Sequence, residues 1–276
     1  MIRLFFVVLL FLTSCSTPAH AKSILLVSTT STQDSGLLDA LLPAFEEASG
    51  YSVQLISTGS GQALKIAEEG NADVILLHSP SAEMKFMEKG LGIDRRLVMH
   101  NDFVVIGPAD DPAKISGKNP VEALKLIYQT QVNFVSRGDE SGTHIKELAL
   151  WKEAALNPSG QPWYIESGQG QGATLSIANE KDGYAITDRG TFLAYQGNIE
   201  LKILVQNDKS LLNVYHVITV NPEKWPQVNA EGARAFADFT TSAQGQQIIR
   251  EFGVDEYGQP LFYPDADKTD LELGLP

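Results

Sequence analysis

The chain has 276 residues, of which 34 are acidic and 21 basic, giving a formal net charge of −13 at pH 7. This acidity argues against nucleic acid as a partner, because proteins that bind phosphate backbones carry clustered lysine and arginine. Cys15 is the single cysteine. The rest of the chain therefore has no disulfide, no zinc thiolate site and no cysteine nucleophile.

The first residues have the features of a secretory signal. An apolar run covers residues 4–12 after one cationic residue, and it is too short to span a bilayer. The sequence offers two alternative cleavage sites. LTSC resembles a bacterial lipobox and would leave Cys15 lipidated, whereas AHA, ending at Ala21, would release a soluble chain. We favour the lipobox because it directly follows the apolar run. We assign residues 1–21 to the signal and expect a periplasmic or otherwise extracytoplasmic protein, lipid-anchored if the lipobox is used.

The first part of the chain alternates strands and helices. Residues 23–27 are an apolar run typical of a buried strand, and residues 37–49 show apolar side chains at helical spacing, with Gly50 as a stop. The polar stretch between them reads as a loop. Pro43 predicts a kink or a split in this helix, because proline lacks an N–H and clashes with the preceding turn. The order then recurs, with strands predicted at 51–57 and 73–77 and a helix at 62–69.

The alternation restarts in the second half of the chain. A strand ending at Gly107 is followed by the polar stretch DDPAKISGKN, which indicates a crossing between domains. Residues 212–220 then read as a strand that returns to the first sheet. Repeated strand, loop and helix favour parallel sheets flanked by helices, so we predict an α/β protein of two lobes. The predicted ranges are 22–105 for the first part of lobe I, 106–210 for lobe II and 211–276 for the second part of lobe I.

Three polar loops place serine, threonine or glycine directly before a predicted helix: STTST at 28–32, TGSG at 58–61 and SRGDESGT at 136–143. The first N–H groups of a helix lack partners within the helix, and the helix dipole favours an anion there. Plain N-capping explains any one loop, but the carboxyl ends of parallel strands gather at one edge of a sheet. Arg137 adds one formal positive charge. Together the loops predict a site for a small oxyanion.

The catalytic interpretation of the third loop is weaker. Asp139, Ser141 and His144 offer a carboxylate, a nucleophile and a base. They lie within about one helical turn, however, and the serine lacks the glycine-flanked turn of a nucleophile elbow. We expect Asp139 to orient Arg137 or to cap the helix, and His144 to lie on the helix surface or to make a hydrogen bond.

The remaining motifs predict no further chemistry. The RGD triplet is short enough to arise by chance, and a bacterial-type leader gives it no adhesion context. GQGQG at 168–172 lacks the spacing of a dinucleotide fingerprint and forms either a tight turn or another set of amides. The five histidines are scattered without metal-ligand spacing. We therefore expect no enzyme, no cofactor and no bound metal cation.

Four motifs together resemble one known family. They are TTST at 29–32, TGSG at 58–61, SRGDxSGT at 136–143 and DGYxxTDR at 182–189. This combination resembles the substrate-binding proteins of tungstate ABC importers, over nearly the whole mature chain. That family belongs to the type II periplasmic binding proteins, which have two α/β lobes, a two-stranded hinge and an oxyanion held between the lobes. The resemblance implies tungstate as the ligand and an ABC permease with its ATPase as partners.

The resemblance also implies a set of ligand-binding residues and a closing motion. The positions that match the family's ligand set are Thr30, Ser31, Ser60, Arg137, Ser141, Gly142 and Thr143. Closure would bend a hinge near Val104 and Tyr215, so that Arg137 completes the site from lobe II.

The choice of anion follows from two positions. Phosphate-binding relatives share the Arg-x-Asp-x-Ser-Gly-Thr pattern but carry an aspartate where this chain has His78. Lack of that carboxylate favours tungstate, molybdate or sulfate over phosphate. Molybdate-binding relatives use neutral donors alone, so Arg137 favours tungstate over molybdate. Molybdate, sulfate or phosphate binding stays open as an alternative, as does an oxyanion sensor for a membrane kinase.

Overall fold

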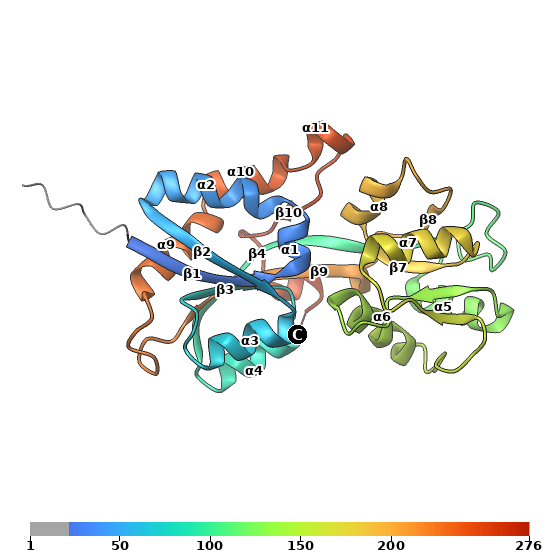
Figure 1. Cartoon of the computed structure of the whole chain (residues 1–276), viewed down its shortest axis with the longest axis horizontal. Helices are drawn as coiled ribbons and strands as arrows, with labels where there is room; N and C mark the ends of the chain where they lie inside the picture. Colours follow the sequence, from blue (N-terminus) through green and yellow to red (C-terminus); the bar gives the residue numbers. More distant parts are fainter. Residues whose placement is uncertain (1–21, 276) are drawn as a thin grey trace, which may run out of the picture.

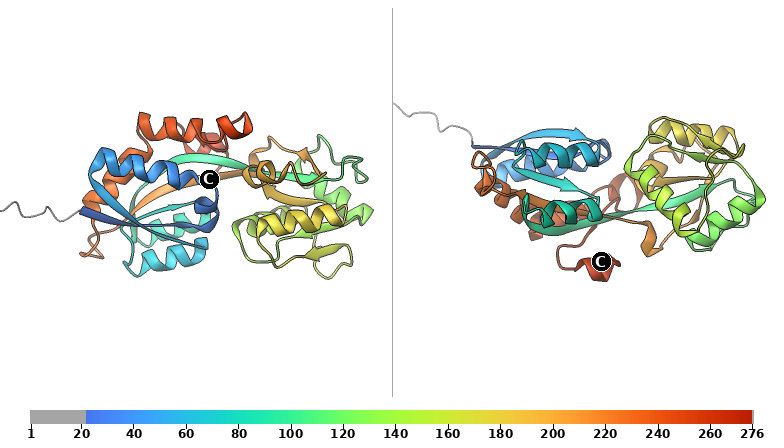
Figure 2. Two further views of the ribbon diagram at one scale, coloured as in Figure 1. Left: turned by 45° about the horizontal axis from the view of Figure 1, so that its top comes forward. Right: turned by 90° about the horizontal axis from the view of Figure 1, so that it is seen from below.

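The structure is a computed structural model that describes residues 22–275. The predicted signal and Cys15 lie outside the described residues. The described chain forms two lobes side by side (Figure 1), as the sequence predicts for an α/β protein of two lobes. Figure 2 shows that two long strands, β4 (Gly92–Gly107) and β9 (Leu212–Val220), run from one lobe into the other.

Lobe I contains both ends of the described chain. Its other strands are β1 (Lys22–Thr29), β2 (Tyr51–Thr58), β3 (Val74–Leu77) and β10 (Tyr263–Pro264). Its helices are α1 (Thr30–Asp34), α2 (Leu37–Ser49), α3 (Ser60–Glu68), α4 (Pro80–Glu88), α9 (Ala230–Thr240), α10 (Ala243–Glu251), α11 (Val254–Tyr257) and the 3-10 turn η2 (Asp270–Leu273).

Lobe II lies between the two long strands in sequence. Its strands are β5 (Phe134–Ser136), β6 (Tyr164–Glu166), β7 (Ala185–Asp188) and β8 (Lys202–Val205). Its helices are α5 (Pro120–Thr130), α6 (Gly142–Glu153), α7 (Gln171–Glu180), α8 (Arg189–Tyr195) and the 3-10 turn η1 (Lys209–Leu211).

The sheet order of lobe I is β10-β4-β9-β3-β1-β2. Strands β1, β2 and β3 are parallel to one another, while β9 runs antiparallel to both β3 and β4. In lobe II, β5 and β6 are parallel, and β7 and β8 pair with the far end of β4. The three parallel strands of lobe I therefore end at one edge, which Figure 1 shows facing lobe II.

Hydrophobic cores hold the lobes separately. In lobe I, one core lies between the sheet and α2, α9 and α10, and another lies between the sheet and α3 and α4. Met99 belongs to the first of these cores, whereas Phe103 and Val104 belong to the cores of lobe II. Strand β4 therefore passes from one core to the other within a few residues. The exact lobe ranges stay a prediction.

Two local predictions need correction. The stretch predicted as a polar loop after β1 contains the five-residue helix α1, in which Thr29 serves as N-cap by accepting from the Thr32 amide. Helix α2 runs unbroken through Pro43, so the predicted split is wrong. Buried leucines and Phe45 on both sides of the proline pack into one core, and this packing outweighs the loss of one backbone hydrogen bond.

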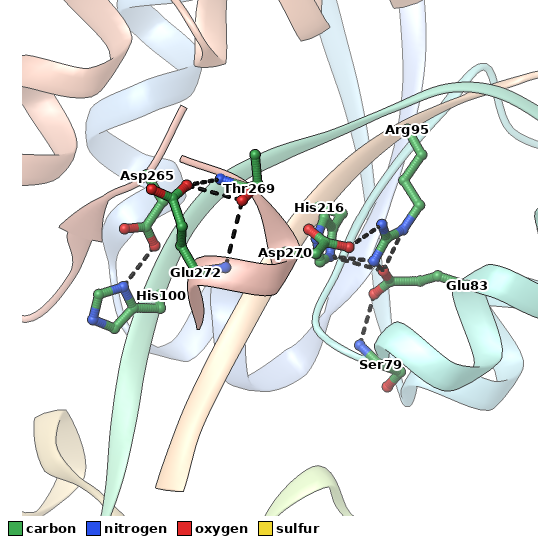
Figure 3. Close-up of polar contacts among 9 residues, drawn as sticks. All are labelled: Ser79, Glu83, Arg95, His100, His216, Asp265, Thr269, Asp270 and Glu272. Carbon is green, nitrogen blue, oxygen red and sulfur yellow. Dashed lines mark hydrogen bonds and ion pairs between the residues drawn. The ribbon is translucent and has the colours of Figure 1, made fainter. Parts of the chain in front are cut away.

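The C-terminal segment ties the two long strands together on their outer side (Figure 3). Asp265 is buried and accepts from His100 Nδ1 on β4 at 2.6 Å. Asp270 accepts from Arg95 Nη1 at 2.7 Å and faces His216 Nε2 on β9 at 2.9 Å. Arg95 also pairs with the fully buried Glu83 at 3.1 Å. Because an unpaired buried charge is costly, this cluster fixes the segment against the strands.

We predict that Arg95→Met lowers the free energy of unfolding by about 3–5 kcal/mol, because it leaves Glu83 and Asp270 without their cation in a buried site. Denaturant unfolding measures the change. The control is Arg250→Met on α10, where the side chain is exposed and a change within about 0.5 kcal/mol is expected. Equal stability of the two variants would contradict the role given to the cluster.

Candidate functional site

The candidate residues of lobe I stand where its parallel strands end. Thr30 and Ser31 follow β1, Ser60 follows β2 after Gly59, and His78 follows β3. Because β1 pairs in register with both β2 and β3, these loops lie at the same edge of the sheet.

Thr29 is the centre of the hydroxyl cluster in lobe I. It is buried, and its Oγ1 lies 2.6 Å from Thr32 Oγ1 and 3.1 Å from Ser31 Oγ. Thr30 and Ser31 are exposed at the start of α1. Ser31 thus belongs to this cluster together with Thr29, whereas the Thr30 side chain makes no hydrogen bond to it within residues 22–275. Thr29 ends β1 and caps α1, and this position was the available signal for its role.

His78 links this cluster to the long strands. Its Nε2 lies 3.1 Å from Thr29 Oγ1 and 3.3 Å from Ser31 Oγ, and its Nδ1 lies 2.8 Å from Asn213 Oδ1 on β9. Asn213 in turn donates to Asn101 Oδ1 on β4 at 2.8 Å. Burial lowers the pKa of His78, against a smaller opposing effect of its bond to Asn213. The ring is therefore neutral near pH 7, with its proton on the nitrogen that faces the amide oxygen.

Arg137 is positioned by its own loop. It pairs with Asp139 and donates from Nη1 to Gln171 Oε1 at 3.0 Å, at the start of α7. Partial burial alone would raise the pKa of Asp139, but hydrogen bonds from Ser141 and Arg137 lower it below its usual value. The prediction that Asp139 orients Arg137 is confirmed. The contact between Arg137 and Gln171 was not evident from the sequence. It brings the GQGQG loop against the arginine.

The turn between Arg137 and Asp139 requires glycine. Gly138 has a φ of 61°, and a β-carbon there would lie 2.9 Å from Glu166 Cβ on the neighbouring strand. The left-handed backbone and the close approach to Glu166 both make any residue other than glycine costly at this position. The RGD triplet is therefore explained by the turn that this loop makes between Arg137 and Asp139.

The start of α6 meets lobe I at His78. Ser141 caps the helix by accepting from the His144 amide at 3.3 Å, and its own amide donates to Asp139 Oδ1 at 3.1 Å. A β-carbon on Gly142 would lie only 3.0 Å from His78 Cε1, so the helix terminus and the imidazole are in close contact. The structure thus brings together Ser31 and His78 of lobe I with Gly142 of lobe II.

Three candidates take no part in these contacts. Within residues 22–275, no hydrogen bond or ion pair joins the side chains of Thr30, Ser60 or Thr143 to the other candidates. Ser60 begins α3, which has no side-chain cap, and Thr143 is buried in the first turn of α6.

The side chains of Ser141 and His144 do not form the nucleophile–base pair of a serine hydrolase. His144 is buried, and its Nδ1 accepts from the Glu140 amide at 3.0 Å, while Ser141 Oγ binds a backbone amide. The hydrogen-bonding role predicted for His144 is confirmed, and the surface position is wrong. Among residues 22–275, no group of three or more histidine, cysteine or carboxylate side chains could hold a metal ion. No helix in this range is long and apolar enough to cross a membrane.

Comparison with known proteins identifies the family. A model described as a PBP superfamily domain matches residues 16–244. The tungstate-binding protein TupA of Peptoclostridium acidaminophilum is 47% identical over 249 residues, covering 89% of this chain and 87% of that protein. The structure of tungstate-binding TupA from Desulfovibrio alaskensis G20 has a TM-score of 0.84 at 42% identity, over 89% of this chain and 100% of that chain. The structure of the tungstate ABC transporter from Geobacter sulfurreducens has a TM-score of 0.73 at 45% identity, over 83% and 98% of the chains.

The chain belongs to the PBP superfamily and, within it, to the TupA family. The resemblance in the sequence and the type II fold predicted from it are thereby confirmed. Members of this family are binding proteins of transporters and not enzymes. The chain is accordingly an extracytoplasmic solute-binding component of an ABC importer.

Helix α6 of this TupA relative carries a buried carboxyl group one turn after its start. Glu147 Oε1 accepts from Tyr164 at 2.6 Å and from Trp151 at 3.2 Å. Burial raises the pKa of Glu147 from 4.5 to about 7, although these hydrogen bonds oppose the shift. The folded protein therefore holds this proton more tightly than the unfolded chain does.

We predict that Glu147 makes the protein less stable as the pH rises. Its folded pKa is raised, so its contribution is full below about pH 4.5 and is lost as the pH increases to about 7. Glu147→Gln should remove this dependence and exceed the stability of the wild type above pH 7 by up to about 3 kcal/mol. Unfolding at a series of pH values measures it. Glu153→Gln, exposed on the same helix, is the control, and identical pH profiles of all three proteins would refute the prediction.

Proposed function

We propose that the chain binds tungstate between its two lobes and delivers it to an ABC permease. The observation that carries this proposal is the contact between the loop after β3 and the start of α6, at His78 and Gly142. It brings hydroxyl donors of one lobe to the helix terminus of the other, as a clamp around a small anion requires. The names of the similar TupA proteins supply the choice of tungstate.

The donors suit a small tetrahedral oxyanion. We infer that Thr30, Ser31 and Ser60 donate from lobe I and that Arg137, Ser141, Gly142 and Thr143 donate from lobe II. Hydroxyls, amides and a guanidinium would contact the oxygens of the anion, so no side chain needs to coordinate the metal atom. Thr29 would hold the Ser31 hydroxyl in place, at 3.1 Å.

The lobes would close around the anion by bending β4 and β9. The hinge residues Val104 and Tyr215 lie on these strands, and Tyr215 packs its ring 4.7 Å from that of His78. Bending there would move α6 relative to the hydroxyl cluster. Closure excludes water, which strengthens each hydrogen bond to the anion.

We predict that Arg137→Ala weakens tungstate binding by about 2–3 kcal/mol, because a charge-assisted hydrogen bond to a desolvated anion is lost. Titration calorimetry on the purified mature protein measures the affinity. Arg234→Ala, on the exposed side of α9, is the control and should bind as the wild type does. Equal affinity of the two variants would remove Arg137 from the binding set.

We predict that phosphate at millimolar excess does not displace bound tungstate. Phosphate near neutral pH keeps a proton, and the position where phosphate-binding relatives place a proton-accepting aspartate is His78 in this chain. A competition titration with tungstate, molybdate, sulfate and phosphate tests this. Displacement by phosphate at that concentration would favour the phosphate alternative instead.

A further inference from the structure

His78 occupies the point where three parts of the molecule meet. Its Nε2 faces the hydroxyls of Thr29 and Ser31, at 3.1 and 3.3 Å. Its Nδ1 is held by Asn213 of β9 at 2.8 Å, and its Cε1 edge lies against Gly142 at the start of α6. An anion bound by Ser31 and by the α6 terminus would therefore lie next to this imidazole.

The fixed cations near this point are already engaged. Arg137 pairs with Asp139, so an incoming anion shares this guanidinium with a carboxylate. Lys146 lies one turn into α6, but its Nζ donates to the carbonyls of Ser210 at 2.9 Å and Leu212 at 3.1 Å. The charges of Arg137, Asp139 and Lys146 thus sum to one positive charge, which is less than the two negative charges of a dianion such as tungstate. An additional positive charge would stabilise the bound dianion.

The hydrogen bonds of the neutral His78 ring show that Nδ1 carries the proton and that Nε2 does not. The Asn213 amide donates from Nδ2 to Asn101 and to Tyr215, so its oxygen accepts from His78 Nδ1. The neutral ring then presents a lone pair on Nε2 toward the hydroxyls. An oxygen of a fully deprotonated anion would be repelled by that lone pair, whereas Nε2–H would donate to it.

We propose that His78 is an anion-binding residue whose Nε2 takes up a proton from solvent when the oxyanion binds. The new N–H bond lies at the edge of the ring that faces Thr29 and Ser31, and Asn213 keeps the other N–H in place. The ring becomes an imidazolium and supplies the charge that the Arg137–Asp139 pair does not. This proposal rests on the proposed function, since it concerns the same site.

The charges around the ring permit this change. Burial lowers the pKa of His78, the bond to Asn213 raises it, Glu83 on α4 and Asp188 on β7 raise it, and Lys146 on α6 lowers it. The neighbouring elements α1 and β9 contribute the uncharged hydroxyl of Ser31 and the ring of Tyr215. A bound dianion would add two negative charges beside the imidazole and favour its protonated form.

Titration calorimetry in buffers of different ionisation heat tests the proposal, because it counts the protons taken up per anion. The wild type should take up a substantial fraction of one proton per tungstate near pH 7. The affinity of the wild type for tungstate should fall by up to tenfold per pH unit as the pH rises from 6 to 8. His78→Gln should bind more weakly, without proton uptake and with a flat pH profile. His100→Gln, which alters a histidine on the outer side of β4, should keep the uptake of the wild type.

Nitrogen-15 NMR of the imidazoles gives a second measurement on the unaltered protein. His78 should change from the Nδ1–H tautomer to a ring protonated on both nitrogens when tungstate is added. Tungstate binding without proton uptake, or uptake that persists in His78→Gln, would overturn the proposal while leaving the proposed function intact. Failure of the wild type to bind tungstate would overturn the proposed function itself.

Discussion

The antiparallel pairing of β4 with β9 is the constraint on which the rest of the molecule depends. Strand β4 pairs with strands of both lobes and β9 pairs along it, so the site at the edge of lobe I and the start of α6 are held at a distance set by this pair. Residues on a strand alternate between its two faces. Asn213 and Tyr215 therefore share the face that meets His78, and His216 lies on the opposite face, against the C-terminal segment.

This alternation gives the hinge two kinds of support. On the outer side, Arg95, His100 and His216 bind carboxylates of the C-terminal segment, which crosses both strands. On the inner side, Asn101 and Asn213 bind each other and reach the ligand edge through His78. A bend of the strands would therefore displace the imidazole directly, since the ring is bonded to Asn213 of β9. The proposed closure and the proposed anion site are thereby linked through one hydrogen-bond chain.

The site also shows why net charge is a poor guide to ligand charge. The chain carries a formal charge of −13, yet its family binds anions. Surface charges are screened over about 8 Å at physiological salt, whereas donors at helix termini act at contact distance. Even Arg137 is paired with the carboxylate of Asp139. Neutral donors and a titratable ring fit this balance better than a cluster of fixed cations would.

The sequence predicted the architecture because the periodic spacing of buried residues is local information. The strand, loop and helix order and the return of the chain at β9 followed from such spacing. The sequence also singled out Arg137 and Ser31 as candidates, since both lie in polar loops before helices. It could not show that the Thr29 hydroxyl bonds with Ser31 and His78, because that depends on whether a short helix follows the strand. The contact of Arg137 with Gln171 joins positions 34 residues apart and depends on how two loops pack.

The close approach of Gly142 to His78 explains why a helix terminus and an imidazole can act on one anion. A β-carbon at position 142 would lie 3.0 Å from His78 Cε1, so any residue other than glycine there would displace the imidazole. The free amides of the first turn of α6 can then approach the same space as Nε2. Water is excluded between these groups when they are in contact, so each hydrogen bond to an anion is stronger than in an open cleft. The glycine thereby makes the charge state of His78 matter for binding, because a proton on a ring this close to the anion is scarcely screened by solvent.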